Sequence, residues 1–297
     1  MAKKHVKYYG VDAFTETAFK GNPAAVCFLE EDKDDEWLQS LAAEFNVSQT
    51  CYLTPIHGTS IPRFGLKWFT PIVEVNLCGH ATLAASHILF SSDLVNNSVI
   101  EFVTLSGVLT VKKIPSIDVV GVPNLLNGKA PPVGFYIELD FPAYYPITKL
   151  YHDDISIIDE ALNGASIIDM KRTEFADDLL VVLTSGKIVL EVQAQFDALA
   201  KLSGRGVSVT GIAPPESGFD FYSRFFSPKF GINEDPVCGT AHCGLAPYWS
   251  EKLGKCDLKA YMASTKGGAL NIHVDKQKQR VFLRGKAVTV IEGYVLV

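Results

Sequence analysis

The chain has 297 residues, of which 47 % are hydrophobic and 20 % are charged, and its formal net charge is −6. This composition excludes a disordered chain, and the acidic balance excludes the basic surface expected of a nucleic-acid-binding protein. No run approaches the roughly 20 apolar residues of a membrane-spanning helix, and the six cysteines form no CxxC pair. We therefore expect a cytoplasmic protein with reduced thiols and no membrane partner.

Short β-like runs rich in Val, Ile, Tyr and Phe alternate with a few helical segments. Strands are predicted at 6–13, 24–28, 51–55, 65–69, 100–103, 107–112, 134–140, 179–183, 206–213, 219–226, 259–263, 269–274, 280–285 and 288–297. Helices are predicted at 34–45, 79–90, 155–163, 193–202 and 239–252. The stretch from about 115 to 132 is rich in turn formers and is predicted to join two domains.

The chain contains an internal repeat. Three pairs of segments match in the same order: 67–71 (KWFTP) with 224–228 (RFFSP), the Cys-Gly at 78–79 with that at 238–239, and 107–111 (GVLTV) with 268–272 (GALNI). Their first residues are 157, 160 and 161 positions apart. The repeat predicts two domains of one fold, 1–118 and 119–287, with the strand at 288–297 returning to the first.

Both segments that follow a Cys-Gly, 80–90 and 240–249, are apolar on nearly every face. A helix of this kind is buried all round, so each domain is predicted to be a curled, mostly antiparallel sheet around a central helix, which is an α+β fold. Gly79 and Gly239 allow close backbone approach to a ligand, and the free N–H groups there favour an anion such as a carboxylate. If the domains face each other, the two helix starts converge on one cleft.

Several side chains are candidates for proton transfer. Glu44 lies at the edge of the apolar face of the helix at 34–45, where partial desolvation is expected to raise its pKa. Cys78 and Cys238 occupy equivalent positions in the repeat and suit a two-base proton exchange, with thiol pKa values lowered by the helix N-termini. The alternatives without a catalytic role are a solvated glutamate and two buried, inert cysteines.

Three polar residues lie beside these candidates. His80 and Thr240 are the matched residues after each glycine, and Asp235 precedes the second helix by a few residues. His80 could bind a carboxylate or shuttle a proton, whereas Thr240 could simply cap a helix and Asp235 could be a solvated turn acid. No metal site is assigned, and no phosphate-binding or dinucleotide-binding pattern is present, so no cofactor is expected.

The segments 12–26 (DAFTETAFKGNPAAV), 43–50 (AEFNVSQT), 69–83 (FTPIVEVNLCGHATL) and 234–241 (EDPVCGTA) resemble the signature blocks of PhzF-like proteins, the phenazine-biosynthesis isomerase family. That family shares the fold of diaminopimelate epimerase, with an active site between two pseudo-symmetric domains. The resemblance implies that Glu44 is the catalytic acid/base and that His80 and Asp235 act beside it. It also implies that Gly239 and Thr240 help hold the substrate, with Thr240 in place of the usual serine. We expect Ser48 and Gly79 to bind the substrate as well.

The sequence departs from the family in one respect. Cys78 and Cys238 stand where diaminopimelate epimerase carries its catalytic cysteines, and typical phenazine enzymes lack that pair. The epimerase's substrate-binding asparagine is replaced by His80, so diaminopimelate is not assigned as the substrate.

Three functions remain open from the sequence. The first is a cofactor-independent isomerase that moves a proton within a small anionic carboxylate through Glu44. The second is a racemase or epimerase of an amino or imino acid that uses Cys78 and Cys238. The third is a non-catalytic binding or scaffolding protein on the same fold. In each case a homodimer is the expected assembly.

Overall fold

The computed structural model describes residues 5–92, 94–115, 134–148, 150–151 and 154–296. The chain divides into two compact units: unit 1 comprises Met1–Phe19, Pro23–Asp140 and Leu283–Val297, and unit 2 comprises Lys20–Asn22 and Phe141–Phe282. Unit boundaries fall inside three strands, β2 (Asn22–Phe28), β8 (Phe135–Pro142) and β17 (Arg280–Gly285). The predicted domain boundary at 118/119, and the predicted linker beyond residue 115, lie outside the described residues.

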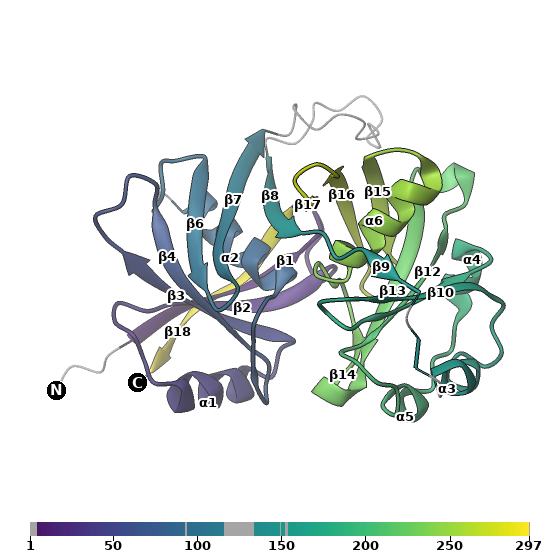
Figure 1. The fold of residues 1–297 in the computed structure, drawn as a ribbon. Coiled ribbons are helices and arrows are strands. Elements are labelled where there is room, and N and C mark those ends of the chain that lie inside the picture. Colours follow the sequence, from purple (N-terminus) through teal and green to yellow (C-terminus); the bar gives the residue numbers. More distant parts are fainter. Residues whose placement is uncertain (1–4, 93, 116–133, 149, 152–153, 297) are drawn as a thin grey trace. The chain divides into compact units, whose positions relative to one another are not determined.

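In its described residues, unit 1 folds as a curled sheet with the helices α1 and α2 (Figure 1). Its elements are β1 (His5–Ala13), β2 (Asn22–Phe28), α1 (Asp35–Phe45), β3 (Gln49–Ile56), β4 (Arg63–Phe69), β5 (Glu74–Val75), α2 (Gly79–Ser91), β6 (Val99–Thr104), β7 (Gly107–Pro115), β8 and β18 (Ala287–Leu296). The pairs β2–β3 and β4–β6 are parallel, whereas β1–β18, β3–β4, β6–β7 and β7–β8 are antiparallel. The last strand therefore pairs with the first, from His5 opposite Leu296 to Ala13 opposite Ala287.

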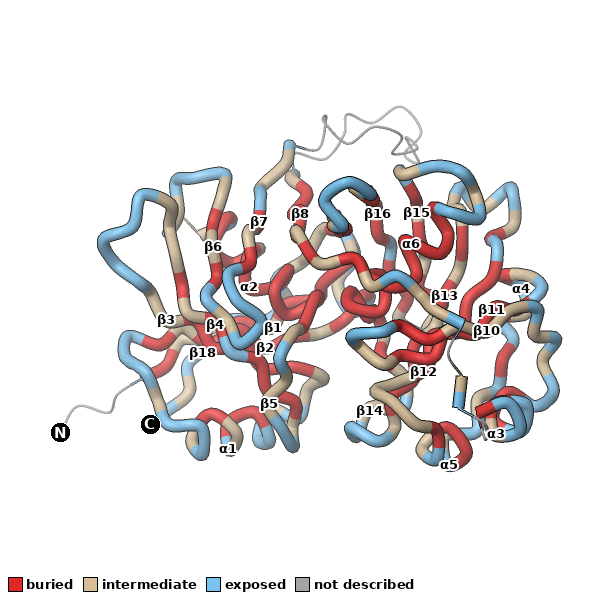
Figure 2. The backbone as a smooth tube through the Cα atoms, in the orientation of Figure 1, coloured by how far each residue is buried: buried red, intermediate tan, exposed pale blue. Residues whose placement is uncertain are grey.

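Helix α2 is the centre of unit 1. Every residue from Gly79 to Phe90 except His87 is buried, as the red tube in Figure 2 shows. The helix packs against β1, β3 and β18, so the curled sheet covers it from several sides. Its two buried hydroxyls lie within the helix, where Thr82 donates to the Cys78 carbonyl and Ser86 donates to the Thr82 carbonyl.

Unit 2 repeats this order of pairing. It contains β9 (Pro146–Ile147), α3 (Asp154–Ala161), β10 (Ile167–Thr173), β11 (Leu179–Leu183), α4 (Gly186–Glu191), α5 (Phe196–Leu199), β12 (Val207–Ile212), β13 (Phe221–Ser227), β14 (Ile232–Asp235), α6 (His242–Leu253), β15 (Asp257–Met262), β16 (Gly268–Asp275) and the first half of β17. The pairs β11–β12 and β13–β15 are parallel, whereas β9–β10, β10–β11, β12–β13, β13–β14 and β15–β16 are antiparallel. Helix α6 is buried from His242 to Ser250 and packs against β9, β15 and β16.

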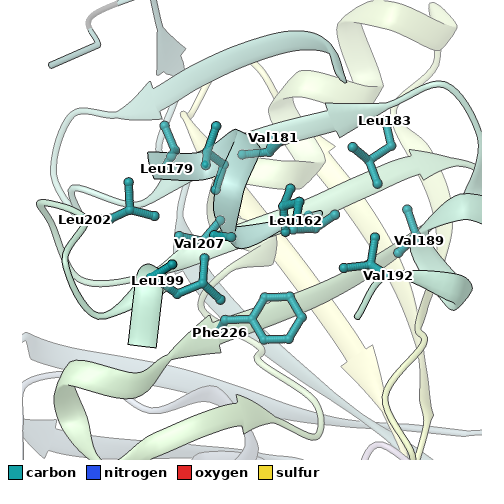
Figure 3. Packing of buried hydrophobic residues seen from close by; sticks show 14 residues of the cluster. Leu162, Leu179, Val181, Leu183, Val189, Val192, Leu199, Leu202, Val207 and Phe226 are labelled. Atoms are coloured by element: carbon teal, nitrogen blue, oxygen red, sulfur yellow. The ribbon is translucent and has the colours of Figure 1, made fainter. Parts of the chain in front are cut away.

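A hydrophobic cluster fixes the three adjacent strands β11, β12 and β13 of unit 2 (Figure 3). It is formed by side chains from these strands and from the helices packed on them, among them Ile158, Leu179, Val181, Leu183, Val189, Leu199, Val207, Val209 and Phe226. These side chains are almost fully removed from water, so the strand register is strongly specified. That register determines which polar residues meet at the strand ends.

The predicted α+β class is confirmed, with each unit a curled, mostly antiparallel sheet around an apolar helix. Some boundaries differ. The segment 239–241 forms tight turns, in which the N–H groups of His242 and Cys243 bond to the carbonyls of Gly239 and Thr240, so α6 begins at His242. The helix predicted at 193–202 shortens to α5, and the sequence pattern did not predict α4 or β10.

Candidate functional site

Helix α1 positions Glu44. The Asp34 side chain caps its first turn by accepting the Trp37 N–H at 2.8 Å. Asn46 ends the helix in the left-handed conformation, with φ of 50°, and its N–H bonds to the Ala42 carbonyl at 3.1 Å. Glu44 is therefore held in the last turn, just before the chain enters β3.

The predicted partial desolvation of Glu44 is wrong, because its side chain is exposed. The buried face of α1 is centred on Leu38, Leu41 and Ala42. At 100° per residue, Glu44 lies roughly 110° from the middle of that face. Trp37, an apolar residue of the same helix, is itself only half-buried. The Glu44 carboxylate makes no hydrogen bond or ion pair to any described residue of the chain.

A second group in unit 1 centres on His80, which is buried at the start of α2. The Nε2 atom of His80 lies 3.2 Å from Ser48 Oγ, and its Nδ1 atom lies 3.4 Å from Cys78 Sγ. The Ser48 hydroxyl donates to the Pro23 carbonyl at 2.8 Å. His80 thus contacts both Ser48 and Cys78, and all three are predicted site residues.

The hydrogens that each side chain carries indicate which atom donates and which accepts in these contacts. Ser48 has one hydroxyl hydrogen, and because Pro23 accepts it, Ser48 Oγ is suited to accept the N–H of His80 Nε2. In a neutral imidazole, Nδ1 is then the acceptor, which suits the S–H of Cys78. Cys78 is also the N-cap residue of α2 but makes no side-chain capping bond, so Gly79 begins the helix without a side-chain cap.

Asp235 belongs to unit 2, where it is the last residue of β14 and is buried. The fully buried Asn22 side chain donates from Nδ2 both to Asp235 Oδ1 and to the Val237 carbonyl, the latter at 3.0 Å. This amide ties the end of β14 to the turn before Cys238. Asn22 therefore fixes the orientation of the Asp235 carboxylate.

Cys238, Gly239 and Thr240 form a buried turn before α6. Cys238 Sγ lies 3.4 Å from Thr240 Oγ1. The predicted lowering of the Cys238 pKa is wrong: burial raises the pKa of this thiol well above its usual value, and the nearby Asp235 carboxylate raises it further. Because the turn separates Cys238 from the first residue of α6, the thiol is not at the helix N-terminus itself.

Arg205 completes the group around Thr240, although the sequence analysis did not select it. Its Nη1 donates to Thr240 Oγ1 at 3.1 Å, while Nε donates to Asp178 Oδ1 at 2.9 Å and Nη2 to Asp178 Oδ2. Asp178 and Arg205 lie just before β11 and β12, whose parallel register places Leu179 opposite Val207. The strand ends therefore bring the ion pair together.

Asn22, Asp178 and Arg205 each had some signal in the sequence. Asn22 lies in the quoted block 12–26, Asp178 immediately precedes an apolar run, and Arg205 is the middle residue of Gly-Arg-Gly. Among the residues that the structure describes, no group of three or more His, Cys, Asp or Glu side chains is arranged to hold a metal ion. In the same part of the chain, no helix is long and apolar enough to cross a membrane.

Comparison with known families identifies the chain. The family described as phenazine biosynthesis-like protein (PhzC-PhzF) matches residues 11–293. The chain belongs to this family. Within it, the chain is 41 % identical to an uncharacterized isomerase of Halalkalibacterium halodurans over 289 residues, which cover 97 % of each chain. It is 37 % identical to the mouse phenazine biosynthesis-like domain-containing protein 2, covering 95 % of this chain and 96 % of the mouse protein.

A solved structure of the phenazine biosynthesis PhzF family from Enterococcus faecalis is similar with a TM-score of 0.81 at 35 % identity, covering 99 % of this chain and 100 % of that one. The family resemblance predicted from the sequence blocks is thus confirmed. Members of the family are named as isomerases, and the chain is classed as an isomerase, as the sequence predicted.

Proposed function

We propose that the protein is a cofactor-independent isomerase that moves a proton within a small carboxylate substrate, with Glu44 as the acid/base. The observation that carries this proposal is the state of Glu44, an exposed carboxylate that no described residue engages, on a helix fixed at both ends. A group that takes up and returns a proton must reach the substrate carbon. A carboxylate that is held in an ion pair within the protein cannot do so.

His80 supplies the second part of the proposal. Its contacts to Ser48 and Cys78 hold the buried ring in one orientation, so it can act on the substrate as a fixed hydrogen-bonding group. We assign Ser48 the role of orienting the ring. The Gly79 backbone, at the uncapped start of α2, is assigned to substrate binding.

Two polar residues of unit 2, Asp235 and Thr240, also have proposed roles. Asn22 holds the Asp235 carboxylate, and Arg205 holds the Thr240 hydroxyl, so both polar groups are ordered before substrate binds. We assign Asp235 an orienting role, and we assign Gly239 and Thr240 to substrate binding. A positioned acid/base contributes about 10²–10⁴-fold to the rate, and preordered donors add to that factor.

One contact favours a second candidate, a racemase or epimerase that uses thiols. The Cys78 thiol has an imidazole acceptor 3.4 Å away in His80, which is the arrangement that activates a cysteine. The partner thiol argues against it, because burial raises the Cys238 pKa and leaves that group protonated at neutral pH. A two-base exchange needs one of the two thiols as a thiolate at the start of each turnover.

Solvent exchange tests the proposal. The protein is incubated in D₂O with a panel of small cyclic and unsaturated carboxylic acids, and deuterium bound to carbon is detected by NMR. We expect one acid to gain deuterium with the unaltered protein, and we expect Glu44→Gln to slow this about 10²–10⁴-fold. Glu36→Gln, on the same helix, is the matched control and is expected to exchange normally. Exchange at the full rate in Glu44→Gln would refute the role of Glu44.

A further inference from the structure

The guanidinium of Arg205 is held more firmly than a surface arginine. The Asp178 carboxylate accepts hydrogen bonds from both Nε and Nη2. The guanidinium carbon lies 4.9 Å from the centre of the Phe225 ring. The Arg205 main chain is also fixed, since its N–H bonds to the Asp177 carbonyl at 3.1 Å and its carbonyl accepts the Ser227 hydroxyl at 2.8 Å. The side chain is therefore presented in one orientation.

The glycines on either side of Arg205 are required by this arrangement. Gly204 has φ of +85°, and an added Cβ would lie 2.0 Å from the Asp177 carbonyl oxygen. At Gly206 an added Cβ would lie 2.5 Å from Cζ of Phe225, the ring against which the guanidinium stacks. Glycine at positions 204 and 206 therefore lets the chain on either side of Arg205 pass close to Asp177 and to Phe225.

The hydrogen-bonding capacity of Arg205 is not used up. A guanidinium has five N–H groups, and three of them bond to Asp178 and Thr240. The remaining N–H groups, one on each terminal nitrogen, meet no acceptor among the described residues, and 32 % of the side chain is exposed. A fixed cation with donors directed away from its own carboxylate partner is suited to bind an oxyanion.

Arg224 in the same unit shows what a purely structural arginine looks like here. It also forks onto a carboxylate, that of Glu234, at 2.6 and 2.9 Å, and it also lies over a phenylalanine ring, that of Phe226, at 5.0 Å. Its Nη1, however, donates to the Val192 carbonyl at 2.6 Å, and only 13 % of its side chain is exposed. The corresponding nitrogen of Arg205 bonds instead to Thr240, a residue of the Cys-Gly-Thr turn.

Thr240 adds a second donor at the same point. Because its Oγ1 accepts an N–H from Arg205, the hydroxyl hydrogen is left to donate. Cys238 lies 3.4 Å from Oγ1. With this sulfur protonated, its S–H can donate to Oγ1, and the hydroxyl hydrogen can then point to a ligand.

We propose that Arg205 and Thr240 together bind a carboxylate group of the substrate, Arg205 through its Nη1–H and Thr240 through its hydroxyl. Asp178 is a positioning residue that sets the guanidinium plane and cancels its charge when no ligand is bound. The inference rests on the proposed function in taking the bound anion to be the carboxylate of the isomerised substrate.

The test uses acetate as the probe and neutral acetamide as its control. Acetate is titrated into the whole protein while the ¹⁵Nε–¹Hε signals of the arginines are followed by NMR. We expect acetate to shift the Arg205 signal and leave the Arg224 signal in place, and we expect acetamide to shift neither. Absence of any acetate effect on Arg205, or an equal effect on Arg224, would overturn the proposal.

Variants supply the second readout. Arg205→Met is expected to weaken acetate binding about tenfold to hundredfold, because one charge-assisted contact is lost. The double variant Arg205→Met/Asp178→Asn, which leaves no buried carboxylate unpaired, is expected to bind equally weakly, whereas Arg224→Met is expected to bind as the unaltered protein does. Unchanged affinity in the double variant would contradict the assignment.

The two proposals can fail separately. Glu44→Gln is expected to bind acetate with the affinity of the unaltered protein even though it no longer catalyses exchange. If acetate binds at Arg205 but no carboxylic acid gains deuterium, the proposed isomerisation is wrong and the anion site stands. If exchange occurs but Arg205→Met leaves acetate binding unchanged, only the anion site is wrong.

Discussion

The substitution Glu44→Gln is expected to stabilise the protein while it slows proton transfer. Glu44 is the next-to-last residue of α1, and the last turn of this helix contains no basic residue. The unpaired carbonyls there carry about half a negative charge, so the Glu44 carboxylate is repelled by its own helix. A residue placed for stability would be neutral or basic at this position.

The size of the effect follows from Coulomb's law. Half a unit charge at roughly 7 Å from the carboxylate, with an effective dielectric constant of about 20–80, gives about 0.3–1.2 kcal/mol of repulsion. Removing the charge should raise the free energy of unfolding by this amount at low salt. The gain should shrink as ionic strength rises, because the carboxylate is exposed.

Glu36→Gln is the matched control for stability as well. Glu36 lies in the first turn of the same helix, where the positive end of the dipole favours a carboxylate. Its neutralisation should lower the free energy of unfolding by a similar amount and leave exchange unchanged. Urea unfolding at low and high salt measures both variants. The reasoning is refuted if Glu44→Gln is as stable as the unaltered protein or less stable at low salt.

Two further predictions concern the packing that supports the site. Burial lowers the pKa of both His87 and His242 to about 4, so below their ordinary pKa of about 6.5 the unfolded chain binds more protons than the folded one. Stability should therefore fall as the pH drops from about 6.5 to 4, with a slope approaching about 2.7 kcal/mol per pH unit, and His87→Phe should halve the slope measured by urea unfolding at each pH. Gly206→Ala should cost about 1–3 kcal/mol because its Cβ meets the Phe225 ring, whereas Gly65→Ala, whose Cβ has no neighbour closer than 3.7 Å, should fold with nearly unchanged stability in the same assay.

Local patterns in the sequence predicted the central helices well. The segment from His80 to Phe90 is apolar on nearly all faces, and only a position inside the unit can bury such a helix. The same kind of reasoning placed Glu44 correctly on α1 but did not predict that its side chain is exposed. Periodicity gives the angle of a residue around a helix, whereas exposure depends on how far the neighbouring strands reach around it.

The polar contacts of the site could not be read from local patterns, because they join distant parts of the chain. Asn22 and Asp235 are 213 residues apart, and only folding brings the amide to the carboxylate. Arg205 meets Asp178 because β11 and β12 pair in parallel, and the sequence analysis did not predict which strands pair. The flanking glycines marked Arg205 as unusual without revealing its partner.

The central claim is that Glu44, and not the thiol pair, moves the proton. The most direct measurement is the rate of deuterium uptake from D₂O by the active carboxylic acid, catalysed by the double variant Cys78→Ser/Cys238→Ser and by Glu44→Gln. The account predicts uptake within a few-fold of the unaltered rate for the double serine variant, and loss of uptake for Glu44→Gln. Uptake that disappears in the double serine variant and persists in Glu44→Gln would contradict it and assign the chemistry to the thiols.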